Sequence, residues 1–269
     1  MCLVLTGYKV SKKYPLILAA NRDEFYERPS ARMDFWETHP DLLAGKDLKQ
    51  GGTWFGVHRH SGFAALTNYR NPSMTKPHAP SRGEIIINLL QSDRSGSGSS
   101  GSGSSGENYL RTLQQKAGMY NGFNLIFGSH ERLFWFSSLK NRIEELSPGI
   151  HGLSNAFLNT PWPKVVSGKK ALADVISSRL SPESLLSILR DTTIPDDNIL
   201  PDTGVGIEWE RRLSPVFIQS DIYGTRSSTV MLIDQSGTAH ITERTYPPEN
   251  RLRYSDHSFT LKLMPDKKK

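Results

Sequence analysis

The sequence has almost no cysteine: Cys2 is the only one in 269 residues. A disulfide framework and a cysteine-rich zinc site are therefore excluded. Long hydrophobic runs are also missing, because no apolar stretch approaches the roughly 18 residues that a membrane span requires. A signal peptide would be continuously apolar, whereas the N-terminal region is interrupted by Lys9, Lys12 and Lys13. We therefore expect no membrane span and a cytoplasmic location.

The sequence also lacks a dense basic patch, although its formal net charge is +6. Lysine and arginine are scattered along the chain, and the only dense run is the terminal Lys267-Lys268-Lys269. This pattern is typical of a solvated surface rather than of a nucleic-acid-binding face. We expect no nucleic-acid partner.

What is present is enough apolar sequence for a core, with a hydrophobic fraction of 36%. The length favours one layered domain over residues 1–269. Short segments rich in β-branched and aromatic residues predict strands, at 2–7, 15–20, 53–58, 62–68, 121–128, 131–137, 228–234 and 238–243. Helical spacing and capping residues predict helices at 81–91, 107–117, 162–180 and 181–191. Together they predict an α+β fold of antiparallel sheets with helices packed outside.

Two segments stand apart from this pattern. Residues 95–106 read "SGSGSSGSGSSG", a composition typical of a designed flexible connection. We interpret this segment as an engineered linker that replaces a native loop between two helices. Residues 192–214 are rich in Pro, Asp and Gly and predict a second, natural irregular region.

Cys2 directly follows the initiator methionine. Removal of Met1 would leave a cysteine with a free α-amine, which combines a nucleophile and a base in one residue. Such an amine has a pKa of about 7.7–8.0, so it accepts the thiol proton near neutral pH. The alternative is that a cysteine at this position only contributes to a buried first strand.

Six segments in chain order carry a family resemblance: "AANRDEFYERP", "GGTWFGV", "AALTNYRNP", "YNGFNLI", "GLSNAFLNTPWPK" and "YGTRSSTVMLID". They resemble the NRDE family, also called the Transport and Golgi Organisation protein 2 family. This resemblance implies an Ntn-hydrolase-like fold, a four-layer αββα sandwich of two antiparallel sheets between helix layers.

The resemblance extends to hydrolases with an N-terminal cysteine, such as penicillin V acylase, bile salt hydrolase and acid ceramidase. It implies a set of candidate catalytic residues, namely Cys2, Arg22, Asp23, Asn155 and Arg226. In the mechanism that the resemblance implies, Asp23 holds the α-amine, an arginine stabilises the thiolate and the Asn155 amide donates to the oxyanion.

One residue departs from the acylase pattern. The acylases place their arginine three residues before the aspartate, where this chain has Ala20, whereas Arg22 and Asp23 are adjacent. Neighbours on a strand point to opposite faces, so both serve one site only if the strand ends or twists between them. The alternative is that Arg22 pairs with Glu24.

Further residues are candidates for substrate binding because they lie at strand ends or beside glycines: Asn21, Trp54, Asn68 and Arg70. His58 and His60 have the spacing of a metal pair, but no third ligand lies nearby in the sequence, which favours surface histidines and no metal site.

Two functions are compatible with the sequence. The first is hydrolysis of an amide or thioester acyl bond through a Cys2 acyl-enzyme, which requires no cofactor. The second, implied by the family resemblance, is a non-catalytic carrier of haem or of an acyl-coenzyme A or lipid ligand in the same cleft, with Cys2, His58 or His60 as haem ligand. The partner is accordingly a small acyl substrate or haem, and the oligomeric state stays open.

Overall fold

The computed structural model describes residues 2–92, 105–249 and 253–264, which form two antiparallel sheets. The first sheet has the strand order β10-β1-β2-β11-β12-β13. Its strands are β1 (Cys2–Tyr8), β2 (Leu16–Phe25), β10 (Gly149–Leu153), β11 (Tyr223–Ile233), β12 (Thr238–Thr245) and β13 (Ser255–Lys262). The second sheet follows chain order from β3 to β9. Its strands are β3 (Ser30–Trp36), β4 (His39–Asp47), β5 (Phe55–His58), β6 (Gly62–Asn68), β7 (Phe123–Gly128), β8 (Leu133–Ser137) and β9 (Arg142–Glu145).

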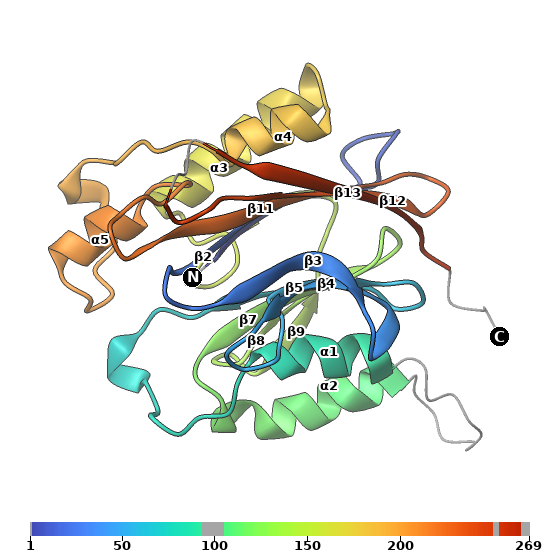
Figure 1. Cartoon of the computed structure of the whole chain (residues 1–269), viewed down its shortest axis with the longest axis horizontal. Coiled ribbons are helices and arrows are strands. Elements are labelled where there is room, and N and C mark those ends of the chain that lie inside the picture. Colours follow the sequence, from blue (N-terminus) through green and yellow to red (C-terminus); the bar gives the residue numbers. More distant parts are fainter. Residues whose placement is uncertain (1, 93–104, 250–252, 265–269) are drawn as a thin grey trace.

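Helices cover the outer face of each sheet (Figure 1). The α-helices are α1 (Gly83–Ser92), α2 (Ser105–Lys116), α3 (Pro163–Ser177), α4 (Pro182–Ile188) and α5 (Ile207–Leu213), and the 3-10 turns are Pro72–Met74, Ala117–Met119 and Asp197–Ile199. Helices α1 and α2 lie on the second sheet, whereas α3 and α4 lie on the first. The predicted αββα sandwich is thereby confirmed.

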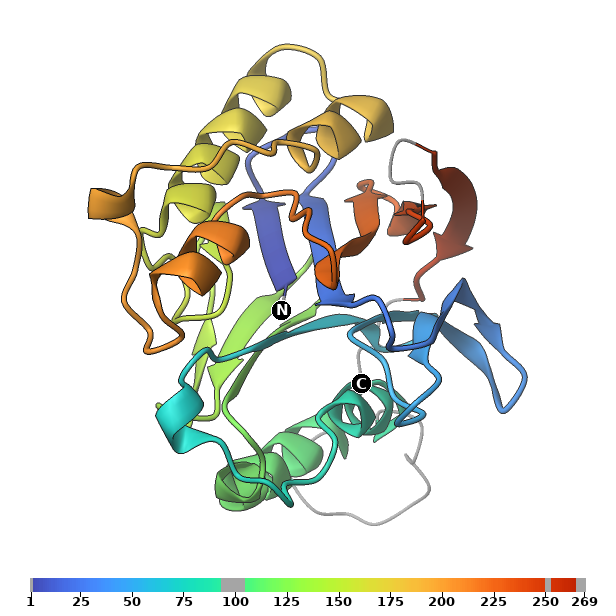
Figure 2. The ribbon, with the colours of Figure 1, turned by 60° about the vertical axis from the view of Figure 1, so that its left-hand side comes forward.

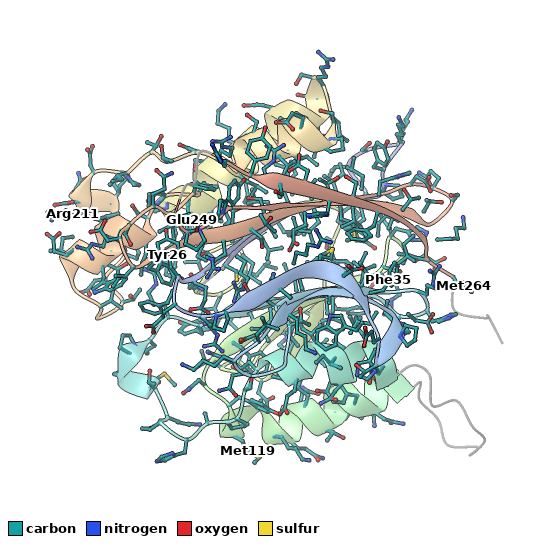
Figure 3. The ribbon with its side chains drawn as sticks, in the orientation of Figure 1. Tyr26, Phe35, Met119, Arg211, Glu249 and Met264 are labelled. Atoms are coloured by element: carbon teal, nitrogen blue, oxygen red, sulfur yellow. The ribbon has the colours of Figure 1, made fainter. Side chains whose placement is uncertain are left out.

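Three cores follow from these four layers. Alternation along β1 sends Leu3 and Leu5 to the core under α3 and α4, while Val4 and Tyr8 enter the core between the sheets. Side chains fill the space between the sheets, as Figure 3 shows. Figure 2 shows β1 and β2 side by side in the first sheet, facing the strands of the second. Residues at the start of β1 therefore lie inside the molecule.

The predicted elements are found with shifted ends, and the largest differences are in β2, which continues to Phe25, and in β11, which begins at Tyr223. The eight predicted strands correspond to β1, β2, β5, β6, β7, β8, β11 and β12, and the four predicted helices to α1, α2, α3 and α4. Ser181 caps α4 as expected, since its hydroxyl accepts from the Ser184 N–H at 3.1 Å. Residues 95–104 of the predicted linker and Lys267–Lys269 lie outside the described residues.

The sequence interpretation missed β3, β4, β9, β10, β13 and α5. Strands β3, β9 and β13 are edge or near-edge strands with many exposed polar residues, so they show no clean alternation of apolar and polar positions. The region 192–214 was wrongly read as wholly irregular, because it contains α5 after Gly206, whose φ is 84°. Within the described residues, no helix is long and apolar enough to cross a membrane.

Candidate active site

Cys2 begins β1 and lies directly opposite Arg22 of β2. It is half-buried and lines a cavity of only about 10 Å³ between the sheets, together with Arg22 and Trp54. A space of this size holds at most about one water molecule. The thiol thus lies in a tight space between the sheets and is only partly accessible to solvent.

Arg22 and Asp23 reach this site in different ways. The Arg22 side chain lies between the sheets, with Cζ 4.0 Å from the centroid of the Trp54 ring and Nη1 3.3 Å from Ser30 Oγ. The Asp23 side chain points to the helix-covered face, where Oδ1 accepts a hydrogen bond from Thr225 Oγ1 at 2.7 Å. The Asp23 backbone N–H donates to the Cys2 sulfur. Adjacent residues therefore serve one site, one through its side chain and the other through its N–H and its charge.

A β-bulge accompanies this arrangement. In the pairing of β2 with β11, Asp23 faces Thr225 and Arg22 faces Ser227, so Arg226 is an extra residue without a partner in the register. A bulge sharpens the local twist at the point where Arg22 gives way to Asp23. The alternative pairing of Arg22 with Glu24 is wrong, because Glu24 instead lies 3.8 Å from Arg28.

The environment of the thiol disfavours the thiolate form. Burial raises the pKa of Cys2, and the negative charge of Asp23 raises it further. The positive charge of Arg22 and the Asp23 N–H oppose this shift in the pKa of Cys2. A base is therefore needed to make the thiolate.

Asn155 lies just past the end of β10, which pairs with β1. Because Leu153 is the partner of Val4, the same register carried two residues further brings Asn155 level with Cys2. Its Nδ2 donates to the Asn68 carbonyl at 2.8 Å, and the Ser154 hydroxyl lies 3.3 Å from its Oδ1 and 3.4 Å from the Cys2 carbonyl oxygen. Since an amide carries two N–H bonds, one remains after the contact with Asn68.

Two predicted site residues have mainly internal partners. Nη1 of Arg226 lies 3.1–3.3 Å from the carbonyl oxygens of Phe25, Tyr26 and Arg28, so this arginine holds the turn after β2. Asn21 Nδ2 donates to the carbonyls of Leu189 and Val216, and Asn21 Oδ1 accepts from the Ser228 hydroxyl. Both N–H bonds of its amide are thereby used within the protein, so Asn21 cross-links β2 to neighbouring segments, and its predicted contact with substrate stays a prediction.

The remaining candidates are distributed around the end of β6. The Trp54 ring stacks on Arg22, and the Asn68 carbonyl accepts from Asn155. The Arg70 N–H donates to the Asn155 carbonyl at 2.7 Å. His58 was wrongly read as a surface residue, since it is 1% exposed and its Nδ1 lies 3.2 Å from the Ser61 hydroxyl.

The sequence interpretation missed a buried ion network beside Asp23. Lys164, near the start of α3, is 3% exposed, and its Nζ donates to the Leu213 carbonyl at the end of α5 at 2.8 Å. Burial lowers the pKa of Lys164 to about 8, while the charges of Asp23 and Cys2 act to raise it. Glu210 of α5 contacts Arg70 at 2.5 Å. Charges of alternating sign thus run from Asp23 through Lys164 and Glu210 to Arg70.

A signal for Lys164 was present in "TPWPK". A lysine in the first turn of a helix opposes the helix dipole, so it requires another reason to be there. Here it lies against the carbonyl end of α5, where a cation is favoured, and near the Asp23 carboxylate. Burial raises the pKa of Asp23, and the positive charge of Lys164 opposes that rise.

The fold and this site define an αββα sandwich protein with a single cysteine at the start of its first strand, enclosed between the sheets. The chain belongs to the Transport and Golgi organisation 2 family, whose sequence model matches residues 1–248.

Relatives in animals match over most of their length. The Transport and Golgi organization protein 2 homolog of Bos taurus is 35% identical, over 97% of this chain and 99% of its own. The Homo sapiens homolog is 33% identical over 98% and 99%, and the Drosophila melanogaster protein 28% identical over 86% of each chain.

Two solved structures show weaker likeness. The Caenorhabditis elegans N-acylethanolamine-hydrolyzing acid amidase ortholog is 10% identical with a TM-score of 0.40, covering 86% of this chain and 92% of that one. Anbu from Hyphomicrobium is 11% identical with a TM-score of 0.37, covering 95% and 87%. At these TM-scores neither likeness bears on function.

Proposed function

We propose that this protein is an N-terminal cysteine hydrolase that cleaves an amide or thioester acyl bond through a Cys2 acyl-enzyme. The observation that carries the proposal is the environment of the Cys2 sulfur. It accepts a hydrogen bond from the Asp23 N–H, faces Arg22 across two paired strands and lies within the field of Asp23 and Lys164. A cysteine that only filled a core would need neither a guanidinium nor a carboxylate beside it.

The proposed chemistry begins with removal of Met1, which exposes the α-amine of Cys2. That amine takes the thiol proton, and the thiolate attacks the substrate carbonyl carbon. The second N–H of Asn155 is the proposed oxyanion donor. Collapse of the tetrahedral intermediate expels the amine or thiol, which receives the proton from the α-amine. Water then hydrolyses the acyl-enzyme by the same route.

The test uses intact mass and a cysteine-reactive acyl probe on the wild type and on Cys2→Ala. We expect a mass that lacks Met1, one added acyl group on the wild type and none on the variant. In Asn155→Ala, the acylation rate should fall by about 10²–10³-fold, the usual cost of one lost oxyanion donor. Retention of Met1 would remove the α-amine as base, and equal labelling of wild type and Cys2→Ala would remove Cys2 as nucleophile.

The second candidate function is a carrier, but the space at Cys2 does not fit haem. A cavity of about 10 Å³ cannot hold a porphyrin. A cavity of about 500 Å³ lies instead at the opposite end of β1, near Tyr8, whose hydroxyl bonds to the Glu131 carbonyl. Its walls include Phe63, Phe127 and His60. The lining mixes apolar side chains with histidines and charged residues such as Arg111 and Arg132, so it suits a large, partly apolar, anionic ligand better than the space at Cys2 does.

Haemin titration tests this carrier proposal. We expect a saturable one-to-one absorbance change that is weakened at least tenfold in His60→Ala and is unchanged in Cys2→Ala. A non-saturating curve, or equal binding by the wild type and His60→Ala, would contradict haem binding in this cavity.

A further inference from the structure

A second large cavity, of about 450 Å³, lies beside the end of β6, at the Cys2 end of the molecule. One wall is the loop 69–76 that follows β6, and the other is the turn 117–122 that precedes β7. Its volume falls in the range of about 300–1,000 Å³ typical of small-molecule sites. The space beside the thiol is more than tenfold smaller, so the bulk of any substrate must lie elsewhere.

The walls of this cavity are fixed by hydrogen bonds between the two loops. Asn121 Oδ1 accepts from the Lys76 N–H at 2.7 Å, and Asn121 Nδ2 donates to the Lys76 carbonyl at 3.2 Å. The Lys76 ammonium group bonds to the Gly118 carbonyl. Tyr69, in the first loop, packs against Phe157 with the rings tilted and their centroids 5.1 Å apart. The cavity is therefore bounded by cross-linked segments and exists without a ligand.

The charge of the lining is one-sided. Among the described residues that line the cavity there are three cations, Arg70, Lys76 and Arg82, and neither Asp nor Glu. Glu210 neutralises Arg70 from the far side, whereas Arg82 has one nitrogen, Nη1, on the Gly122 carbonyl at 3.0 Å. The acid nearest in sequence is Glu84, which is exposed and accepts from the Tyr120 hydroxyl. Amide side chains of Asn68 and Asn121 add donors to this positive lining.

Arg82 links this cavity to the thiol. Burial lowers the pKa of Arg82, while the charges of Glu24 and Cys2 act to raise it, so its guanidinium lies in the field of the Cys2 end of the site. The backbone makes a second link, since the Asn68 carbonyl and the Arg70 N–H both bond to Asn155. Two residues of the cavity wall, Asn68 and Arg70, thus contact the proposed oxyanion donor Asn155 directly.

We propose that this cavity binds an anionic group of the substrate, a phosphate or a carboxylate, through Arg82 and Lys76. The inference rests on the proposed hydrolase function and narrows its substrate class. The substrate is an acyl compound that carries negative charge away from the reacting carbonyl, with the carbonyl at Cys2 and the charge between the loops 69–76 and 117–122.

The experiment measures anion binding by calorimetry in full-length Cys2→Ala, so that turnover plays no part. The probes are inorganic pyrophosphate and glutarate, whose comparison separates a phosphate site from a carboxylate site. We expect one-to-one saturable binding of at least one probe. Loss of a charge-assisted hydrogen bond costs about 1.5–3 kcal/mol, so Arg82→Gln should weaken binding by about 10–100-fold.

Two further variants make the result decisive. Lys76 is exposed, so Lys76→Gln should fold and should weaken binding severalfold even if Arg82→Gln does not fold. The control Arg142→Gln removes an equal charge from an exposed site paired with Glu144 and should bind as the parent does. Absence of saturable binding by both probes, or equal loss in Arg142→Gln, would overturn the anion site.

A last measurement separates this inference from the proposed function. In the wild type, the saturating probe should slow iodoacetamide modification of Cys2 at least threefold, because we expect an anion bound at Arg82 to hinder approach from the Cys2 end of the site. Anion binding without acylation of Cys2 would keep the site and reject the hydrolase. Acylation of Cys2 without anion binding would keep the hydrolase and reject the site.

Discussion

At the scale of single residues, the site depends on charges that have little water around them. Asp23 is 1% exposed and Lys164 is 3% exposed. The charge of Lys164 acts to lower the pKa of Asp23, and the charge of Asp23 acts to raise the pKa of Lys164, so each favours the charged form of the other. A buried charge whose partner is removed is strongly destabilising, although the pair itself adds little net stability. Replacing Lys164 is therefore the most direct way to measure the cost of burying the Asp23 charge.

We expect Lys164→Met to lower the free energy of unfolding at pH 7 by about 3–5 kcal/mol, since it removes the largest positive charge acting on the buried Asp23. The double variant Lys164→Met/Asp23→Asn should recover most of this loss. Guanidinium denaturation midpoints of the single and double variants measure both. Lys169→Met is the matched control on α3, because Lys169 is exposed and bonds to Asn159. A loss of similar size in the double variant would show that Lys164 acts through packing alone.

The same substitution has a defined pH dependence. Burial raises the folded-state pKa of Asp23, and loss of Lys164 raises it further. In Lys164→Met, the stability that protonated Asp23 contributes is therefore present at low pH and is lost as pH rises through that pKa. In the wild type, Lys164 has a folded pKa of about 8, below the ordinary lysine value of 10.5, so stability rises across that interval because the unfolded chain binds more protons. The stability deficit of Lys164→Met should therefore grow with pH.

At the scale of elements, the sequence predicted what has strong local signals. Buried strands such as β2 and β11 contain short apolar runs, and α4 begins at Pro182 after its cap Ser181, so both kinds of element were found. Strand β10, "GIHGL", has two glycines and forms because it pairs with β1. Tertiary pairing of this kind leaves no local signal.

The candidate site shows the same division between local signal and tertiary placement. The family resemblance brought together Cys2, Asp23 and Asn155, which the fold places at one end of β1. It could not show that Arg226 reaches back to three backbone carbonyls, because that depends on the bulge in β11. Nor could it show Lys164, since the partner that explains its burial is the end of α5, about 50 positions away in the chain.

At the scale of the whole molecule, the two sheets are joined by polar contacts as well as by the core between them. Glu243 of β12 is 1% exposed, and its Oε2 accepts from the Met33 N–H of β3 at 2.6 Å. Arg22 of β2 makes a second link to β3 through Ser30. The Arg22 contact lies beside Cys2, so the spacing of the sheets at the site depends on it, whereas the Glu243 contact lies two strands further along the first sheet.

The state of Glu243 should therefore affect the stability of the whole sandwich. Burial raises the pKa of Glu243, while the Met33 N–H and the Arg22 charge oppose the rise. Stability from this residue is fully present at low pH and is lost as pH rises through the folded pKa. Glu243→Gln keeps an acceptor for Met33 but cannot ionise, so its stability relative to the wild type should increase between pH 5 and pH 8.

Denaturation midpoints at the two pH values measure this prediction, with Glu145→Gln as the control at an exposed ion pair with Arg132. In Glu243→Ala the Met33 N–H loses its acceptor, and we expect a stability about 1–3 kcal/mol below that of Glu243→Gln at both pH values. That contrast separates the hydrogen bond from the charge: Gln removes only the pH dependence, whereas Ala also opens the contact between β12 and β3. A Gln variant that loses stability relative to the wild type as pH rises would mean that the ionised carboxylate itself holds the sheets together.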